Sequence, residues 1–133
     1  PGKAITFGLL GGKPYLGLSG NPAAAYVGFE VLARPAIRKM RGFAEGARPV
    51  QQATLTHGVK KRQDRRFYDR ASVARDAQTG ELMVTEAKSQ NSALLGTMQR
   101  ANCLLRINEG PCELERGDVV DVVRVDLPEG TVL

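Results

Sequence analysis

The triplet Gly20-Asn21-Pro22 constrains the fold strongly, because it joins an apolar, strand-like run to a helix-like run. Asn21 is a suitable N-cap, since its side-chain oxygen can accept a hydrogen bond from a free N–H of the first helical turn. Pro22 suits the first helical position, where its missing N–H would have had no partner. Such a turn directs backbone N–H groups and the positive end of a helix dipole at one point, which favours phosphate. The plainer interpretation is a capped turn without a ligand, because the pattern of a P-loop or a dinucleotide fingerprint is lacking.

The residues on either side of this triplet predict two strands and one helix. Residues 4–10 and 13–19 are apolar runs separated by Gly11-Gly12, which predicts a hairpin with a tight turn. After the triplet, apolar residues recur at steps of three and four and give the helix one apolar face: Phe29, Leu32, Ala36, Ile37 and Met40. Gly42 is placed as a C-terminal stop. Pro35 lies inside this pattern and predicts a kink, or two helical pieces, around residues 33–34.

After residue 42 the pattern changes to short runs of alternating polarity. Residues 52–59, 66–75, 81–88, 102–108 and 118–125 are strand candidates, with turn sequences between several of them. Residues 92–101 are ambiguous and could form one helical turn. Five short strands in this length favour a small β-barrel or sandwich. We expect the boundary between the two parts to lie between Gly42 and Pro49.

Composition excludes several classes of protein. With 42% hydrophobic and 25% charged residues, global disorder of the 133-residue chain is not expected. No apolar run approaches the roughly 20 residues of a membrane span, and the N-terminus lacks the layout of a signal peptide. We therefore expect a cytosolic protein without a membrane partner, in which Cys103 and Cys112 are free thiols rather than a disulfide or part of a zinc site.

The net charge of +5 favours anionic partners, and much of it lies in one segment. Six basic residues occur within eleven positions: Lys60, Lys61, Arg62, Arg65, Arg66 and Arg70. A solvated strand edge would carry the same pattern, because basic residues at an edge discourage aggregation. The alternative is a ligand-facing strand, on which Arg66 and Arg70, four residues apart, project to the same face.

No catalytic set can be assembled from the chain. His57 is the only histidine, and next to Gly58 in a strand-like run it is expected to be a structural or surface residue. Asp118 and Asp121 fit turn and strand-face positions. A hydrolase triad, a metal-ligand cluster and a paired-carboxylate site all lack partners. If the chain belongs to an enzyme, part of that enzyme lies outside it.

Several linked motifs resemble the MoeA-type molybdopterin molybdenumtransferases, the family that includes the gephyrin E domain. Residues 1–42 are similar to the end of the family's catalytic domain, with PGK, FG and GNP in order and a helix that contains Arg34-Pro35 and ends in a basic turn. The remainder is similar to the family's C-terminal β-barrel. There the matching motifs are Arg66 to Arg70, Gln90-Asn91-Ser92 and Ala101-Asn102-Cys103-Leu104.

The resemblance implies a mixed fold, in which a β-hairpin and a helix from the end of an α/β domain (residues 1–47) precede a small all-β barrel (residues 48–133). It implies that the parent protein inserts molybdenum from molybdate into adenylylated molybdopterin with Mg²⁺, whose ligands lie outside this chain. It also implies a homodimeric parent, contacts with upstream domains of the same protein, and an isolated fragment that does not turn over.

The family's functional residues transfer position by position. Lys3 matches the lysine of PGK and is the catalytic candidate. The pterin-binding candidates are Ser19, Gly20, Asn21, Pro22, Arg66, Arg70 and Ser92. Ser19 stands where the family usually has proline, and Asn91 stands where glycine is common. The competing hypothesis is a freestanding basic β-barrel that binds RNA or a protein partner, although only Phe67 and Tyr68 could stack on bases within the basic run.

Overall fold

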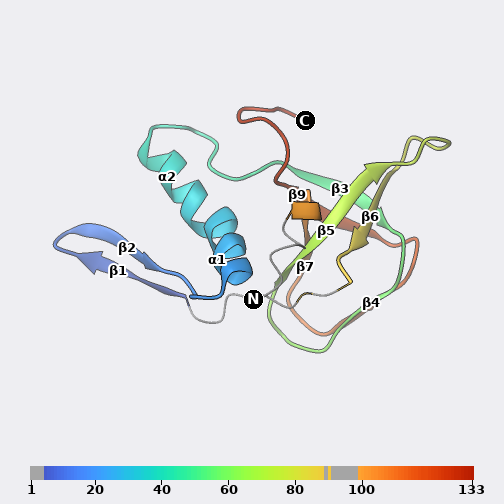
Figure 1. The fold of residues 1–133 in the computed structure, drawn as a ribbon, viewed down its shortest axis with the longest axis horizontal. Helices are drawn as coiled ribbons and strands as arrows, with labels where there is room; N and C mark the ends of the chain where they lie inside the picture. Colours follow the sequence, from blue (N-terminus) through green and yellow to red (C-terminus); the bar gives the residue numbers. More distant parts are fainter. Residues whose placement is uncertain (1–4, 89, 91–98) are drawn as a thin grey trace. The chain divides into compact units, whose positions relative to one another are not determined.

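The computed structural model describes residues 5–88, 90 and 99–133 of the 133-residue chain. By their internal contacts these residues divide into two compact units, one covering residues 5–48 and the other residues 49–88, 90 and 99–133. Figure 1 shows the hairpin and helix of the first unit and the β-sheet of the second.

The first unit begins with the expected hairpin. Strands β1 (Thr6–Leu10) and β2 (Lys13–Gly17) pair antiparallel, with Thr6 opposite Gly17 and Leu10 opposite Lys13. Gly11 and Gly12 have φ angles of 56° and 77°, the left-handed region that a tight two-residue hairpin turn requires and that glycine adopts without strain. The prediction of two strands joined at this pair is confirmed.

The helix that follows is interrupted as expected, and the interruption has a specific form. Helix α1 (Pro22–Gly28) passes into a π-helical turn, η1 (Phe29–Ala33), and then into α2 (Arg34–Met40). In the π-helical turn the N–H of Arg34 reaches back five residues to the carbonyl of Phe29. Pro35 has no N–H and its ring crowds the preceding turn, so widening that turn lets the helix continue on both sides. Gly42 ends the helix with a φ of 87°, and its N–H bonds to the Lys39 carbonyl at 3.0 Å.

The segment after the helix folds back and contacts it. Arg48 binds the buried Glu30 through two hydrogen bonds, from Nε at 2.9 Å and from Nη2 at 3.3 Å. Gly46 comes so close to the helix that a Cβ added there would lie 2.9 Å from the Pro35 carbonyl oxygen. Because this separation is shorter than a van der Waals contact, position 46 requires glycine.

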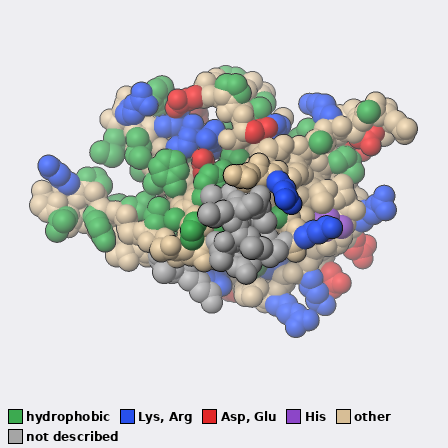
Figure 2. Space-filling model, in the orientation of Figure 1, with side chains coloured by type: hydrophobic (Ala, Val, Ile, Leu, Met, Phe, Trp, Pro, Cys, Tyr) green, Lys and Arg blue, Asp and Glu red, His purple; other side chains and the backbone are tan. Residues whose placement is uncertain are grey.

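The apolar face predicted for the helix is largely exposed in the described structure. It borders a hollow of about 390 Å³ between the helix and the hairpin, which Phe7 and Tyr15 line from the strands and Leu32, Ile37 and Met40 line from the helix. These five side chains are between 43% and 74% exposed. Figure 2 shows apolar side chains gathered over this unit. An apolar surface of this kind is typical of an interface.

The second unit is a closed five-stranded barrel, as predicted. Its strands are β3 (Val50–Leu55), β5 (Phe67–Arg75), β6 (Leu82–Glu86), β7 (Cys103–Ile107) and β9 (Val119–Arg124), in the spatial order β3-β6-β5-β7-β9. The β3–β6 pair is parallel, and the other neighbouring strands are antiparallel. Alternate residues fill the interior, with Leu55, Val84, Leu105 and Val122 fully buried.

Two short strands were not predicted from the sequence. Strands β4 (Val59–Lys61) and β8 (Cys112–Leu114) form a separate antiparallel ribbon, in which Val59 lies opposite Leu114 and Lys61 opposite Cys112. Three-residue strands that carry charged residues give little signal of period two.

The turns between strands follow the sequence signals. The Asp76 carboxylate accepts hydrogen bonds from the N–H groups of Gln78 and Thr79, and Gly80 then adopts a φ of 75°.

Most of residues 92–101, for which one helical turn was considered, lies outside the described residues. No helix in the described part of the chain has the length and apolarity that a membrane crossing needs.

Candidate functional site

The turn between β2 and α1 has the predicted position but a different capping bond. Asn21 is the N-cap residue, and its carbonyl accepts the first helical hydrogen bond from the Ala25 N–H at 2.9 Å. Its side chain makes no capping bond within the described residues. Instead, Ser19 Oγ accepts a hydrogen bond from the Asn21 N–H at 3.2 Å. The predicted side-chain cap is therefore wrong, and the Ser19 hydroxyl instead holds the backbone of the turn.

The surface that this turn offers to a ligand lies at Gly20. Gly20 is exposed, and a Cβ added there would meet no atom within 4 Å among the described residues, so a ligand could approach its backbone. Asn21 Oδ1 is buried and has no hydrogen-bond partner in the described part of the chain. Because Ala23 is completely buried, its N–H group is not open to an anion from solvent. Gly20 thus offers a free backbone surface, whereas Asn21 Oδ1, like the Ala23 N–H, is not open to a ligand from solvent.

The two barrel arginines do not form the predicted exposed pair. Arg66 lies one residue before β5, is 41% exposed, and pairs with Glu109 at 3.2 Å. Arg70 lies within β5 and is completely buried, and desolvation lowers the pKa of its guanidinium group. The expectation that both project from one strand to the same open face was wrong, because the Arg70 side chain is buried and Arg66 lies just outside β5. Lys3 and Ser92 lie outside the described residues.

Part of the basic segment is used to hold the barrel together. Lys61 is 2% exposed, and its ammonium group donates hydrogen bonds to the carbonyls of Arg65 and Asn108 and lies 5.3 Å from the centroid of the Phe67 ring. Lys60 lies 4.0 Å from Glu113 across the β4–β8 ribbon. Fewer cations of this segment are therefore available to an anionic ligand than the count of basic residues indicates.

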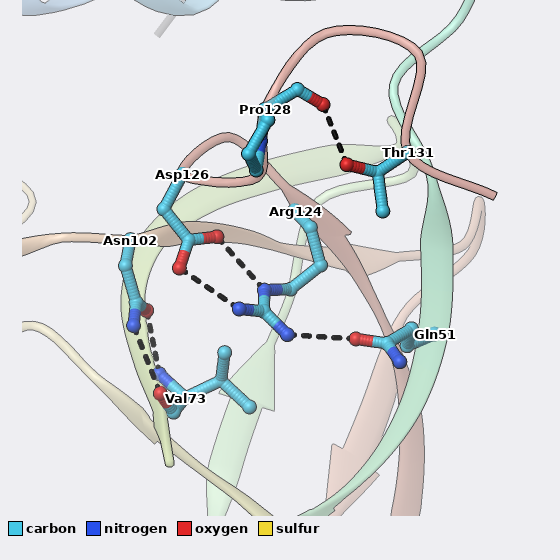
Figure 3. A network of polar contacts seen from close by, with 7 residues as sticks. All are labelled: Gln51, Val73, Asn102, Arg124, Asp126, Pro128 and Thr131. Atoms are coloured by element: carbon cyan, nitrogen blue, oxygen red, sulfur yellow. Dashed lines mark hydrogen bonds and ion pairs between the residues drawn. The ribbon is translucent and has the colours of Figure 1, made fainter. Parts of the chain in front are cut away.

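Two amide side chains, both in motifs singled out from the sequence, extend the hydrogen bonding of β5. Gln90 Oε1 accepts from the Arg70 N–H and Gln90 Nε2 donates to the Arg70 carbonyl, both at 2.9 Å. Asn102 does the same for Val73, at 2.7 Å to the N–H and 2.9 Å to the carbonyl (Figure 3). Strand β5 pairs with β7 over residues 67–71 and with β6 over residues 71–75. Each amide therefore takes the place of a neighbouring strand just where that strand ends.

Arg124 links the first and the last strand of the barrel. Arg124, at the end of β9, binds both carboxylate oxygens of Asp126 at 2.9 and 2.8 Å and donates to Gln51 Oε1 of β3 at 2.8 Å (Figure 3). The ion pair raises the pKa of Arg124. Two oxygens held by one planar guanidinium group fix its orientation, which favours a structural role.

A pair of carboxyl groups inside the barrel was missed by the sequence analysis. Asp69 on β5 is 6% exposed, and Glu86 lies at the end of the neighbouring strand β6, opposite Ala71. Burial and the neighbouring carboxyl raise the pKa of Glu86 to about 7, and burial raises the pKa of Asp69. The alternation Asp69, Ala71, Val73 placed an acid on the inner face and could have revealed it.

His57 and the cysteines match their predicted structural roles. His57 Nε2 accepts a hydrogen bond from the Glu86 N–H at 2.9 Å, and its Nδ1 lies 2.9 Å from the Gly58 carbonyl, so a neutral ring with a proton on Nδ1 satisfies both contacts. Both cysteines are free. Cys103 is buried in the barrel core, which raises the pKa of its thiol to about 12.

The described residues do not fit a metal ion. Within residues 5–88, 90 and 99–133, no group of three or more His, Cys, Asp or Glu side chains is arranged to bind one. The arrangement offers a turn with an open backbone, an exposed arginine and a rigid barrel.

Comparison with known proteins assigns the second unit to a protein family. Residues 52–125 match the MoeA C-terminal region (domain IV). The chain belongs to the MoeA family. It is 35% identical over 127 residues to molybdopterin molybdenumtransferase 1 of Mycobacterium tuberculosis, a match that covers 92% of this chain and 30% of that protein. It is 30% identical over 123 residues to the molybdopterin molybdenumtransferase of Staphylococcus aureus, covering 92% and 29%.

Solved structures agree with this assignment. A molybdopterin biosynthesis MoeA protein from Pyrococcus horikoshii superposes with a TM-score of 0.71 and 25% identity over 93% of this chain and 29% of that one. The mixed fold, mostly β with one interrupted helix, is therefore a MoeA fold. The chain spans about 30% of the length of the curated relatives that it matches.

Proposed function

We propose that this chain is the C-terminal part of a molybdopterin molybdenumtransferase, whose complete form inserts molybdenum from molybdate into adenylylated molybdopterin. One observation carries the proposal. The similarity to enzymes of that name extends over 92% of this chain, and so includes most of the first unit as well as the barrel. Because the chain spans about 30% of those relatives, turnover requires the rest of the protein, and the fragment alone is expected to be inactive.

Within this function, the turn at Gly20 would form one wall of the pterin pocket. Its open backbone at Gly20 permits close approach of a ligand, whereas Asn21, whose Oδ1 is buried, would act by capping the helix that follows. Ser19 and Pro22 would hold the shape of this turn, and Lys3 and Ser92 remain candidates by resemblance alone.

In the barrel, Arg66 is the candidate for direct contact with an anionic group. It is exposed, and its ion pair with Glu109 is also solvent-exposed and therefore easily exchanged for a ligand phosphate. Arg70 is proposed to act indirectly, because its side chain is completely buried.

The Mg²⁺ expected for the parent enzyme would need ligands elsewhere. The described residues provide no suitable cluster of side chains. Molybdate would be a substrate of the complete protein.

The apolar hollow of the first unit fits the proposal that this unit completes a larger α/β domain. A two-stranded sheet and one helix leave the side chains of Phe7, Leu9, Leu10 and Met40 more than 70% exposed. A surface of this kind is expected to be covered by the upstream part of the same protein. A homodimeric parent and a cytoplasmic location are further expectations of the same proposal.

The test uses the complete protein that contains this chain. Molybdenum insertion is measured from adenylylated molybdopterin and molybdate for the wild type, Lys3→Ala, Arg66→Ala and the control Arg62→Ala, which removes an exposed arginine of the same segment. We expect the first two variants to lose activity and Arg62→Ala to retain it. A wild-type protein that neither binds molybdopterin nor inserts molybdenum would refute the proposal.

The same preparation tests the alternative of a basic nucleic-acid-binding barrel. Nothing in the similarities favours that alternative, and the burial of Lys61 reduces the surface charge on which it depends. Salt-dependent binding of single-stranded RNA at near-physiological ionic strength would support it.

A further inference from the structure

Two loops of the barrel unit lie side by side, because paired strands bound them at both ends. The 62–66 loop joins β4 to β5, and the 108–111 loop joins β7 to β8. The β4–β8 ribbon pairs the residues at one end of the loops, and β5 pairs with β7 at the other end. Between these ends, the Gly110 N–H bonds to the Asp64 carbonyl at 2.9 Å and so connects one loop to the other.

The side chain of Lys61 is a second connection between the loops. Its ammonium group donates a hydrogen bond to the Arg65 carbonyl at 2.6 Å and another to the Asn108 carbonyl, so it has one acceptor in each loop. These two acceptors belong to the residues directly before Arg66 and Glu109. One buried group therefore fixes the backbone from which both side chains of the Arg66–Glu109 ion pair start.

The Arg66–Glu109 pair does not hold the loops in place by itself. Arg66 Nε lies 3.2 Å from Glu109 Oε1, and Arg66 Nη2 lies 3.2 Å from Glu109 Oε2. Two such contacts set the plane of the guanidinium group. The two side chains are 41% and 62% exposed, however, and an exposed ion pair adds little stability. The position of Arg66 therefore depends on the bonds that connect the two backbones.

A buried lysine is a costly way to connect two loops. Lys61 is almost fully buried, and none of the ion pairs found among the described residues includes it. Its desolvation is offset by the two carbonyl acceptors and by the Phe67 ring, whose centroid lies 5.3 Å away. An apolar side chain of the same length would fill this space without that cost, but it would leave the loops free to separate.

We propose that Lys61 is a positioning residue for Arg66. By holding the carbonyls of Arg65 and Asn108, it keeps the Arg66 guanidinium group at one place on the barrel surface, where an anionic group can reach it. This role rests on the proposed contact between Arg66 and an anionic group of the pterin substrate.

Hydrogen exchange of the complete protein, followed by mass spectrometry, tests the connection without reference to activity. In Lys61→Met, the peptide that contains the Gly110 N–H should exchange about tenfold faster or more than in the wild type. The peptide that contains the Leu55 N–H, which bonds to the Asp118 carbonyl elsewhere in the barrel, should lose less protection. Lys60→Met is the matched control, because Lys60 is the neighbouring residue of β4 and its side chain is 59% exposed; it should exchange as the wild type does.

Kinetics of the complete enzyme test whether Lys61 acts through Arg66. Lys61→Met and Arg66→Ala should each lower kcat/KM for adenylylated molybdopterin by about tenfold. The double variant should be no slower than Arg66→Ala alone, because a guanidinium group that is missing cannot be misplaced. Lys60→Met should keep the kcat/KM of the wild type.

Three results would overturn the inference: an unchanged kcat/KM in Lys61→Met or in Arg66→Ala, losses that add in the double variant, or equal losses of protection at Gly110 and Leu55. If Lys61→Met does not fold, Lys61→Gln, which keeps an N–H donor without the charge, provides the same comparison. A complete wild-type protein without activity would refute the proposed function instead, and hydrogen exchange would then decide whether Lys61 holds the two loops together.

Discussion

Asn102→Ala is expected to destabilise the barrel strongly, although Asn102 is a polar residue at the start of a strand. The substitution removes the hydrogen bonds of 2.7 and 2.9 Å through which Asn102 holds the Val73 N–H and carbonyl. Val73 is 5% exposed, so water does not easily reach the two backbone groups that are left. With about 1 kcal/mol for each lost bond and a further penalty for unsatisfied buried groups, we expect a loss of about 3 kcal/mol. For a unit of this size this corresponds to a fall in Tm of roughly 15 °C.

The assay is urea and thermal unfolding followed by circular dichroism, with Ser72→Ala as the control. Ser72 lies next to Val73 on β5 and donates one exposed hydrogen bond to the Arg100 carbonyl at 3.1 Å. Its loss should cost less than about 0.5 kcal/mol. Asn102→Asp keeps an acceptor for the Val73 N–H and should fall between the two. A loss of less than about 1 kcal/mol in Asn102→Ala would show that the amide does not act as a substitute strand.

Other substitutions test separate parts of the structure. Gly46→Ala should cost about 1–3 kcal/mol, because its Cβ would overlap a helix carbonyl, and limited proteolysis should then cleave the first unit faster than in the wild type. Iodoacetamide should label the half-buried Cys112 before Cys103, because the Cys103 thiol is buried and has a pKa of about 12. Equal labelling rates of the two thiols by mass spectrometry would contradict the burial of Cys103 in the barrel core. Arg70→Ala should lower the stability of the barrel by about 2 kcal/mol or more, whereas Arg66→Ala should leave it nearly unchanged, as thermal melts would show.

The sequence predicted elements whose signals are local. Gly11-Gly12, Pro35 and Gly42 act through the backbone dihedral angles that their residue types allow, and the structure has a tight turn, a π-helical turn and a helix end at those places. The five barrel strands were also recognisable, because one residue in two must face the interior.

The features that were missed depend on contacts between distant residues. Lys61 appeared to belong to a charged surface, but the β4–β8 ribbon buries it against carbonyls of residues 65 and 108. Asn21 was expected to cap its own helix, yet Ser19 forms the bond that holds the turn. Arg70 and Asp69 are adjacent in the sequence and face opposite sides of β5, so a pattern of period two predicts that one of them is exposed, yet both are buried.

The closed barrel also constrains the order in which the protein can form during synthesis. Strand β3 is the first of the five to be made, and it pairs with β6 and with β9, the last. The β3–β9 pairing joins Val50 to Val123, so the ring of strands cannot close until residues beyond 120 have left the ribosome. Until then β3 and β7 present unpaired backbone edges, the sites at which strands of different molecules associate. A chain that terminates before Val119 should therefore aggregate rather than form a smaller barrel.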